Sequence, residues 1–273
     1  MGPTLWGMRA ARTYRKTADS RSLHTEAASL RWLRAAGGAR VVELVDFDAN
    51  AGYLTTRLVR EHAPTAQMAY EFGQGLALTH AAGAEYFGAL PPGLSCPARF
   101  ANLDLPAGDP AQSWGEFYAE CRLQPYLDLA RRRGGIDAAG GVVVEKAIAA
   151  IAGGDHTSAL PALCRERGVA AARTHGDLWG GNVLWGEIDD DAGGWLIDPA
   201  AHGAHAETDL AALALFGSPH LADTVAGYQA VSPLAEGWRE RVGLHQLHML
   251  LVHAALFGAG YGRQCVQVAR SLA

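Results

Sequence analysis

The most informative motif of this chain is Thr174-His175-Gly176-Asp177-Leu178-Trp179-Gly180-Gly181-Asn182. A second acidic motif, Ile197-Asp198-Pro199, follows it, and its carboxylate lies sixteen residues beyond Asn182. In kinase-type phosphoryl transfer one carboxylate accepts the proton of a hydroxyl, an amide oxygen holds Mg²⁺, and a second carboxylate joins the metal to the nucleotide phosphates. Residues of these three types follow each other here in that order. The two motifs together predict phosphoryl transfer from a nucleotide.

Three side chains carry the expected chemistry. Asp177 is the candidate general base, because a carboxylate within hydrogen-bond reach of a hydroxyl can orient it and accept its proton. Asn182 and Asp198 are the candidate ligands of Mg²⁺, which prefers oxygen donors. Asn182 opens one expected strand and Asp198 closes the next. If the turn 187–194 joins these strands in a hairpin, both donors lie at the same end of it.

Three further side chains in or near the motif are predicted to support the site. His175 is expected to hold the loop through its ring nitrogens rather than to react. Trp179 lies inside the loop, where an indole ring could either form a wall of the substrate site or pack into the core. Asp209 could bond backbone amides of the loop and hold it rigid, or it could cap the helix that begins there.

Size and composition limit the class of protein. The chain has 273 residues, of which 49% are hydrophobic and 19% are charged, which is typical of a globular protein with a sizeable core. The net charge of -5 and the lack of a basic tract argue against nucleic-acid binding. Neither a signal peptide nor an apolar run long enough for a membrane span is recognised. The four cysteines have no CxxC spacing, so reduced thiols and a cytoplasmic location are expected.

The expected elements divide the chain into residues 1–62, with strands and one helix, and residues 63–273, which are mainly helical. A cleft between two such parts is a preferred place for a ligand. Residues 90–110 are expected to be a long irregular connection. The helical stretch 112–133 is expected to kink or break before Pro125. Strands are expected at 12–18, 41–47, 53–59, 183–185 and 195–198, and the other helices at 22–36, 66–82, 141–152, 160–167, 206–216, 219–230, 238–257 and the C-terminus.

A candidate ion pair lies in the first part of the chain. Lys16 is on the expected strand 12–18, and Glu26 is on the first turns of the helix that follows. In kinase-like sites a strand lysine contacts the α and β phosphates, and a helix glutamate positions that lysine. Arg15 is adjacent to Lys16 but should point to the opposite face of the strand. Taken with the downstream motifs, Lys16 and Glu26 are predicted to position the nucleotide phosphates.

These residues resemble the fructosamine kinase (ketosamine-3-kinase) family, which belongs to the wider group of aminoglycoside and choline kinase-like folds. The tryptophan inside the loop, Trp179, separates this family from generic aminoglycoside kinases. The resemblance extends over residues 12–265 and rests on five segments, which are 114–125, 175–185, 197–200, 209–217 and 244–258.

The resemblance implies an α+β, two-lobed protein-kinase-like fold, with a small antiparallel-sheet N-terminal lobe and a larger helical C-terminal lobe. It also implies an ATP- and Mg²⁺-dependent kinase that phosphorylates a sugar hydroxyl of a ketosamine, which is a glycated amine and a small-molecule substrate. Asp177 would be the general base, and Asn182 and Asp198 would be the metal ligands. Lys16 and Glu26 would position the phosphates. The backbone of Glu61, His62 and Ala63 would correspond to the hinge that binds adenine.

One departure from the family pattern concerns the start of the chain. Only fifteen residues precede Lys16, and the glycines among them are Gly2 and Gly7. The first strand and the loop that covers the phosphates are therefore expected to be shortened or missing. Two other functions stay open, namely a kinase for another alcohol such as an aminoglycoside or choline, and a non-catalytic nucleotide-binding protein with a degenerate N-terminal lobe. The exact acceptor is undecided, as is the choice between monomer and dimer.

Overall fold

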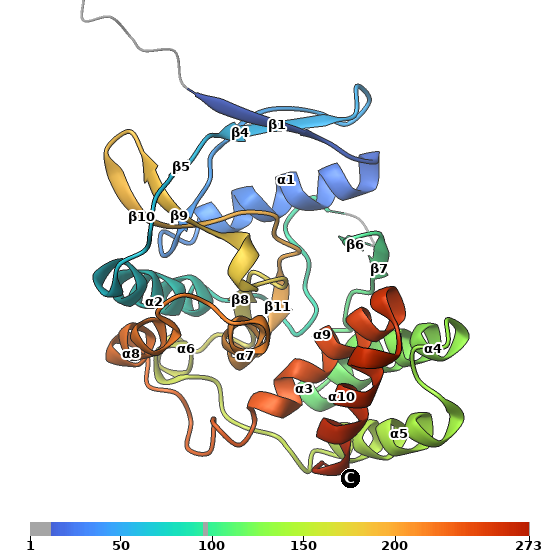
Figure 1. The fold of residues 1–273 in the computed structure, drawn as a ribbon. Helices are drawn as coiled ribbons and strands as arrows, with labels where there is room; N and C mark the ends of the chain where they lie inside the picture. Colours follow the sequence, from blue (N-terminus) through green and yellow to red (C-terminus); the bar gives the residue numbers. More distant parts are fainter. Residues whose placement is uncertain (1–11, 95–97, 273) are drawn as a thin grey trace, which may run out of the picture.

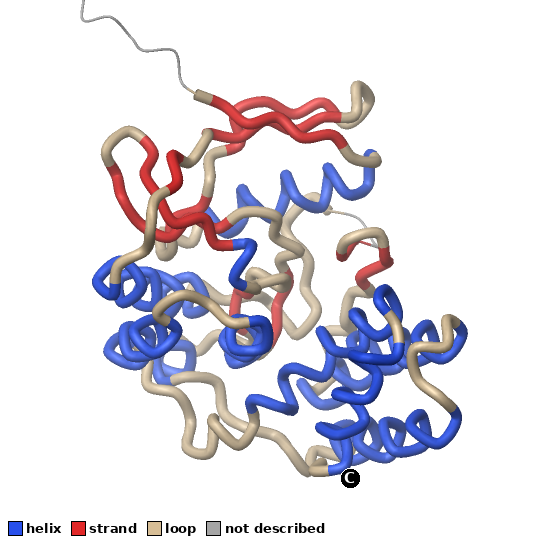
Figure 2. The backbone as a smooth tube through the Cα atoms, in the orientation of Figure 1, coloured by secondary structure: helices blue, strands red, loops and turns tan. Residues whose placement is uncertain are grey.

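The structure is a computed structural model that describes residues 12–94 and 98–272 (Figure 1). Its longer strands lie toward one end of the molecule, and most of its helices lie toward the other (Figure 2). The expectation of a shortened first strand and phosphate loop falls mainly on residues 1–11, which lie outside the described residues. Among the described residues, no helix is both long and apolar enough to cross a membrane.

A three-stranded antiparallel sheet, in the order β1-β4-β3, covers helix α1 (Ser20–Arg34). Its strands are β1 (Thr13–Thr17), β3 (Leu44–Asp48) and β4 (Tyr53–Arg57). Asp19 begins the helix, because its side chain accepts hydrogen bonds from the free amides of the first turn. In β1, Tyr14 faces Thr56 and Lys16 faces Leu54. Because side chains alternate along a strand, Tyr14 and Lys16 lie on one face of the sheet and Arg15 on the other.

A second sheet has the order β2-β10-β9-β5, and it contains the expected hairpin. The strands are β2 (Arg40–Val41), β5 (Arg60–Glu61), β9 (Val183–Ile188) and β10 (Asp191–Leu196). The expected turn 187–194 was too long, since Asp189 and Asp190 alone turn the chain, with φ of 49° and 68°. Two left-handed residues give the tight turn that suits twisted strands. Gly194 belongs to β10 instead, and a Cβ there would lie 2.9 Å from the ring of Trp185.

The remaining elements are mostly helices at the expected places. They are α2 (Ala66–Ala81), α3 (Trp114–Phe117), α4 (Gln124–Arg132), α5 (Ala138–Ala152), α6 (Ala162–Glu166), α7 (Glu207–Phe216), α8 (Leu221–Val231), α9 (Val242–Phe257) and α10 (Ala259–Arg270). Two short antiparallel strand pairs were missed, β6 (Ala98–Phe100) with β7 (Leu103–Leu105) and β8 (Ala172–Thr174) with β11 (His202–Ala204). The first pair interrupts the segment 90–110, so the expectation of an irregular connection there was only partly right.

The irregularity expected before Pro125 is a π-helix, η1 (Tyr118–Leu123), between α3 and α4. Pro125 lies in the first turn of α4, where its missing N–H is no loss. The helical path therefore continues past the proline through a widened turn rather than a break. Tyr118 lies within this turn and is buried, and its hydroxyl donates to the backbone oxygen of Leu244 at 3.0 Å in α9.

Helices α2 and α8 pack closely because each has a glycine at the contact. A Cβ on Gly73 would lie 1.9 Å from the backbone oxygen of Thr224, and one on Gly227 would lie 1.9 Å from that of Tyr70. We expect Gly227→Ala to lower the free energy of unfolding by about 1 to 3 kcal/mol, because the helices must separate to admit the methyl group. Urea unfolding would measure the change.

The matched control is Gly260→Ala in α10, because a Cβ at Gly260 would have no other atom within 4 Å. Alanine is the better helix former, so this variant should be as stable as the parent or slightly more stable. Equal losses of stability in the two alanine variants would contradict the close packing of α2 against α8.

Candidate active site

The loop that carries Asp177 is closed by hydrogen bonds to Asn182. The side-chain Nδ2 of Asn182 donates to the backbone oxygen of Asp177 at 2.8 Å and to its carboxylate Oδ2 at 3.1 Å. The short helix η2 (Gly180–Asn182) links the two residues. Because the amide nitrogen of Asn182 is directed at Asp177, its amide oxygen is directed away and can coordinate a cation. The candidate base and one candidate metal ligand are therefore placed together.

His175 is buried and joins the loop to the segment that precedes Asp198. Its Nδ1 accepts a hydrogen bond from the backbone N–H of Asp177 at 3.2 Å, and its Nε2 lies 2.9 Å from the backbone oxygen of Ile197. A carbonyl only accepts, so the ring must donate from Nε2. Burial lowers the pKa of His175, which favours this neutral form. The ring therefore has the structural position that the sequence predicted for it.

The turn of the loop requires glycine at position 176. Gly176 has φ of 82°, and a Cβ there would lie 2.2 Å from the backbone oxygen of Ala200. Any side chain would therefore be strained and would push the loop away from the chain segment that follows Asp198.

Asp209, at the start of α7, holds the loop from behind. Its carboxylate accepts hydrogen bonds from the backbone N–H groups of His175 at 2.7 Å and of Gly176 at 3.1 Å. The sequence left open whether Asp209 supports the loop or caps a helix. These contacts with the loop amides are the ones expected if Asp209 supports the loop. Burial would raise the pKa of Asp209, but these hydrogen bonds and His80 lower it overall, so that the carboxylate is charged.

Two residues behind Asp209 were missed by the sequence analysis. Nε2 of His80 lies 3.1 Å from the Asp209 carboxylate, and Nδ1 of His80 lies 2.9 Å from the hydroxyl of Tyr228. All three side chains are buried. A single histidine and a single tyrosine on expected helices give no signal in the sequence, because α2 and α8 become neighbours only in the fold.

Lys16 and Glu26 form the predicted ion pair, with 2.5 Å between Nζ and Oε2. The same Nζ also contacts the Asp198 carboxylate at 2.7 Å. Burial lowers the pKa of Lys16, but the two carboxylates outweigh it and raise the pKa above its ordinary value. Burial also raises the pKa of Glu26 to about 7, although Lys16 opposes this shift. The ammonium therefore stays charged at neutral pH.

Asp198 lies at the same end of the β9–β10 hairpin as Asn182, as predicted. The backbone N–H of Ile197 donates to the backbone oxygen of Asn182 at 3.1 Å, which fixes the two segments side by side. Asp198 has φ of 52°, a left-handed backbone conformation that is uncommon for residues other than glycine.

The charge around Asp177 affects its own protonation. Burial raises the pKa of Asp177 to about 7, and the nearby charges of Asp198 and Asp209 add to the shift. Such a gathering of oxygen donors and negative charge suits Mg²⁺.

A cleft of about 280 Å³ begins at this group of residues. Lys16, Glu26 and Asp198 line one end of it, and Glu61 lines it as well. Its apolar walls come from both sheets and from the segments beside them, and they include Val42, Leu54, Val59, Leu184 and Ile197. This is the composition of a small-molecule site, with apolar walls and a few polar groups.

The expected hinge follows β5 along one side of this cleft. The backbone N–H of His62 donates to the backbone oxygen of Trp185 at 3.0 Å, so it is used within the sheet. Glu61 lies opposite Gly186, next to the hydrogen-bonded pair of His62 and Trp185. In an antiparallel ladder, hydrogen-bonded and non-hydrogen-bonded pairs alternate, so Glu61 and Gly186 form a non-hydrogen-bonded pair. Because backbone groups alternate along a strand, the N–H and C=O of Glu61 point away from β9. The His62 amide is therefore already paired within the sheet, and of the expected hinge residues only Glu61 and Ala63 stay candidates for backbone contacts with adenine.

The three tryptophans near the motif differ in exposure. Trp185 and Trp195 are buried, which fits the expectation of core packing. Trp179 is 41% exposed, and a Cβ on Gly181 would lie 2.2 Å from its ring. The indole therefore packs against the glycine, at the surface of the loop that carries Asp177.

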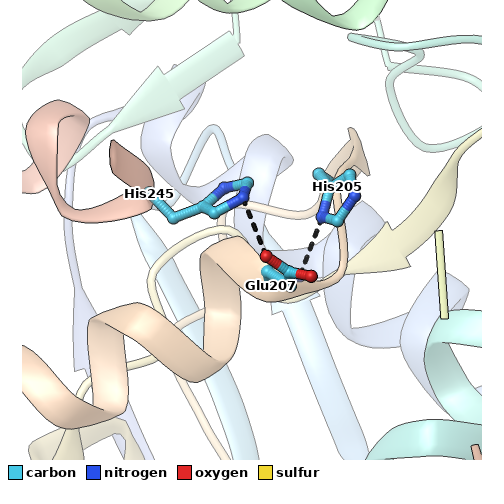
Figure 3. Close-up of side chains that lie close together, drawn as sticks. All are labelled: His205, Glu207 and His245. Atoms are coloured by element: carbon cyan, nitrogen blue, oxygen red, sulfur yellow. Dashed lines mark hydrogen bonds and ion pairs between the residues drawn. The ribbon is translucent and has the colours of Figure 1, made fainter. Parts of the chain in front are cut away.

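A second group of candidate metal ligands, His205, Glu207 and His245, is buried at the start of α7 (Figure 3). Glu207 already has a cation partner, because Arg241 donates to its two oxygens at 2.7 Å and 3.0 Å. Nδ1 of His205 is also used, since it accepts the backbone N–H of Glu207 at 3.2 Å. A metal ion would be repelled by the guanidinium, so these contacts describe a charge-paired structural cluster rather than a metal site.

Buried histidines make the fold sensitive to acid. Burial lowers the pKa of His202 and of His205 to about 3 and also lowers that of His175, His245 and His248. These groups are neutral in the folded chain but bind protons in the unfolded chain below its ordinary value of 6.5. These histidines should therefore lower the free energy of unfolding as the pH falls below about 6.5, by up to about 1.4 kcal/mol per pH unit each, while Asp177 and Glu26, whose pKa values are raised to about 7, offset part of this loss.

The five histidines outnumber the two opposing carboxylates, so the chain should lose much of its stability toward about pH 5, because total stability is only about 5 to 15 kcal/mol. Circular dichroism with urea titrations from neutral to acid pH would measure this. A free energy of unfolding that stays constant down to pH 5 would contradict the neutral burial of these rings.

Comparison with known proteins agrees with the fold. The structure matches a crystal structure of a presumed fructosamine-3-kinase from Thermobifida fusca YX-ER1, with a TM-score of 0.82 and 41% identity, over 96% of this chain and 85% of that one. It also matches the choline kinase LicA from Streptococcus pneumoniae, with a TM-score of 0.59 and 16% identity, over 97% of this chain and 87% of that one. Because its sequence identity is low, the second match supports the fold alone. The predicted α+β protein-kinase-like fold is confirmed.

Similarity in sequence leads to the same family. A probable ketoamine kinase from Synechocystis is 34% identical over 206 residues, which are 73% of this chain and 60% of that protein. The ketosamine-3-kinase of Mus musculus is 32% identical over 161 residues, which are 59% of this chain and 47% of that protein. The chain thus spans about half to three fifths of these curated relatives. The family model for fructosamine kinase matches residues 12–273, and the chain belongs to the fructosamine kinase family.

Proposed function

We propose that this protein is an ATP- and Mg²⁺-dependent kinase that phosphorylates a sugar hydroxyl of a ketosamine. The observation that carries the proposal is the meeting of Asp177 and Asn182 with Asp198 and the Lys16–Glu26 pair, from segments far apart in the sequence. Family membership supports the acceptor class, since a mouse relative is named a ketosamine-3-kinase.

In this proposal the cleft between residues 1–62 and 63–273 holds ATP. The adenine lies between the apolar walls, with the backbone C=O of Glu61 and N–H of Ala63 as its hydrogen-bond partners. Lys16 lies at the other end of the cleft, where it contacts the α and β phosphates. Glu26 holds the ammonium at 2.5 Å already, so little side-chain freedom is lost when the phosphates bind.

Mg²⁺ would be held by the amide oxygen of Asn182 and the carboxylate of Asp198, and when bound it neutralises charge on the transferring phosphoryl group. Asn182 is pre-oriented because its nitrogen is fixed on Asp177. Asp198 presents its second oxygen beside the contact with Lys16. Both ligands come from one hairpin end, which keeps their spacing fixed.

Asp177 orients the acceptor hydroxyl and takes its proton. As the new bond forms between that oxygen and the γ phosphorus, the bond from phosphorus to the β–γ bridging oxygen breaks and ADP leaves. The proton of the hydroxyl moves to Asp177 late in this step. His175 and Asp209 keep the carboxylate in place, and Trp179 forms a wall beside the sugar.

Turnover assays with a panel of acceptors test the proposal. The purified protein, with ATP and Mg²⁺, should release ADP and form a phosphorylated product with a fructosyl amino acid, as seen by mass spectrometry. Choline and an aminoglycoside should give far lower kcat/KM. Efficient turnover of either one, without turnover of ketosamines, would favour a kinase for another alcohol. ATP binding without transfer to any acceptor would favour the non-catalytic alternative.

A further inference from the structure

An aromatic surface runs outward from the loop of Asp177. It consists of five rings, which are Trp179, Phe216, His253, Phe257 and Tyr261. Trp179 comes from the loop and Phe216 from the end of α7, and the other three come from the end of α9 and the start of α10. Phe257 is 67% exposed and Trp179 is 41% exposed. Phe216, His253 and Tyr261 between them are partly buried. A connected aromatic path that reaches the surface at both ends is the kind of apolar feature that marks a binding face.

The rings form a continuous path by direct contact. The centroid of Trp179 lies 6.3 Å from that of Phe216, in an edge-to-face arrangement. Phe216 lies 4.7 Å from His253, which in turn lies 5.3 Å from Phe257 and 5.0 Å from Tyr261. These separations are typical of aromatic pairs that stabilise each other. The path is therefore a fixed feature of the surface rather than a set of separate side chains.

The path begins within one turn of the proposed base. The backbone N–H of Trp179 donates to the backbone oxygen of Asp177 at 3.1 Å, so the two residues share one tight turn. Gly181 lets the indole pack against the backbone, since a Cβ there would lie 2.2 Å from the ring. A substrate whose hydroxyl reaches Asp177 therefore has its remaining atoms close to Trp179 and the rings beyond it.

The rings suit a cation with an apolar substituent. A ketosamine contains a secondary amine that is protonated at neutral pH, and aromatic faces attract such cations. Nδ1 of His253 lies 2.8 Å from the backbone oxygen of Met249, and because a carbonyl only accepts, Nδ1 carries the proton. The other ring nitrogen, Nε2, is then an acceptor. The surface thus offers aromatic faces together with one acceptor for an N–H group.

We propose that this aromatic surface binds the amine-derived half of the ketosamine and favours amines with an aromatic or long aliphatic substituent over small ones. This inference rests on the proposed function. The sugar half would lie at Asp177 and Trp179, and the amine half would extend over Phe216 toward Phe257. The surface would thus decide which glycated amines are good substrates, whereas the loop would decide that a sugar hydroxyl is phosphorylated.

The test compares two ketosamines that share the same fructosyl group, one made from glycine and one from phenylethylamine. For the parent protein, kcat/KM should be about tenfold higher for the phenylethylamine derivative, mostly through a lower KM, because burying the aromatic substituent adds binding energy. In Phe257→Ser this ratio should fall toward one. Val142→Ser is the matched control, since Val142 is also exposed, at 50%, but lies on α5. It should keep the parent ratio.

Four outcomes would overturn the inference. Equal kcat/KM for the two ketosamines in the parent protein would overturn this inference and leave the proposed function standing. An unchanged ratio in Phe257→Ser would do the same, as would a dimer in sedimentation that Phe257→Ser makes monomeric, because a second copy would then cover the rings. Turnover of neither compound would overturn the proposed function and, with it, this inference.

Discussion

Asp177→Asn is expected to lower kcat about a thousandfold while the protein becomes more stable. The loss follows because an amide cannot accept the proton of the acceptor hydroxyl, and general-base catalysis contributes about 10² to 10⁴ in rate. The gain in stability follows because burial raises the pKa of Asp177 to about 7, so the charged form opposes folding. The sign is that of a raised carboxyl pKa, for which stability is lost as pH rises from 3.8 through 7.

The two effects are measured separately, by ADP release with a fructosyl amino acid and by urea unfolding at about pH 8, where the native carboxylate is charged. We expect the free energy of unfolding to rise by roughly 1 to 3 kcal/mol. Asp155→Asn, in an exposed loop, is the control and should change neither quantity. An Asp177→Asn variant with parent activity would remove Asp177 from the chemistry.

Asp198→Asn is expected to weaken binding of Mg²⁺·ATP by about 10- to 100-fold, since an amide is a poorer ligand for a hard cation than a carboxylate. Asparagine is chosen because it tolerates the left-handed backbone of Asp198, with φ of 52°, better than alanine does. Titration calorimetry, with and without Mg²⁺, measures the effect. The dependence of ATP affinity on Mg²⁺ should largely disappear in the variant.

Asp189→Asn is a closely matched control for this experiment. Asp189 also has a left-handed backbone, with φ of 49°, and also pairs with a cation, Arg57, at 2.5 Å. It lies at the opposite end of the β9–β10 hairpin and does not line the cleft itself, although its partner Arg57 does. The control should bind Mg²⁺·ATP like the parent protein. Equal affinity for Mg²⁺·ATP in the Asp198 and Asp189 variants would count against Asp198 as a metal ligand.

Much of the site could be predicted from the sequence because its chemistry is concentrated in short motifs. The spacing within residues 174–198 placed Asn182 and Asp198 at one end of a hairpin, and the hairpin is present. Period-two and helical patterns located β1 and α1, and so brought Lys16 and Glu26 within reach of each other. In these cases the determining interactions are local, or join elements that are neighbours along the chain.

Other features depend on contacts between distant segments and left no local signal. His80 and Tyr228 reach Asp209 only because α2 and α8 pack together through Gly73 and Gly227. The length of the β9–β10 turn was overestimated because acidic and glycine residues suggested a loop. Gly194 is a strand residue that makes room for the ring of Trp185. The aromatic path likewise joins three helices and a loop that only the fold brings into contact.

In the proposed function, Asp177, Asn182 and Asp198 form one site for phosphoryl transfer to a glycated amine. The most direct measurement is the transfer of labelled phosphate from ATP to fructosyl-lysine by the purified protein, with Mg²⁺ and with Mg²⁺ removed by a chelator. We predict a phosphorylated ketosamine that forms only with Mg²⁺ and that Asp177→Asn forms about a thousandfold more slowly. Absence of labelled product with Mg²⁺, in protein that is folded and binds ATP, would contradict the claim.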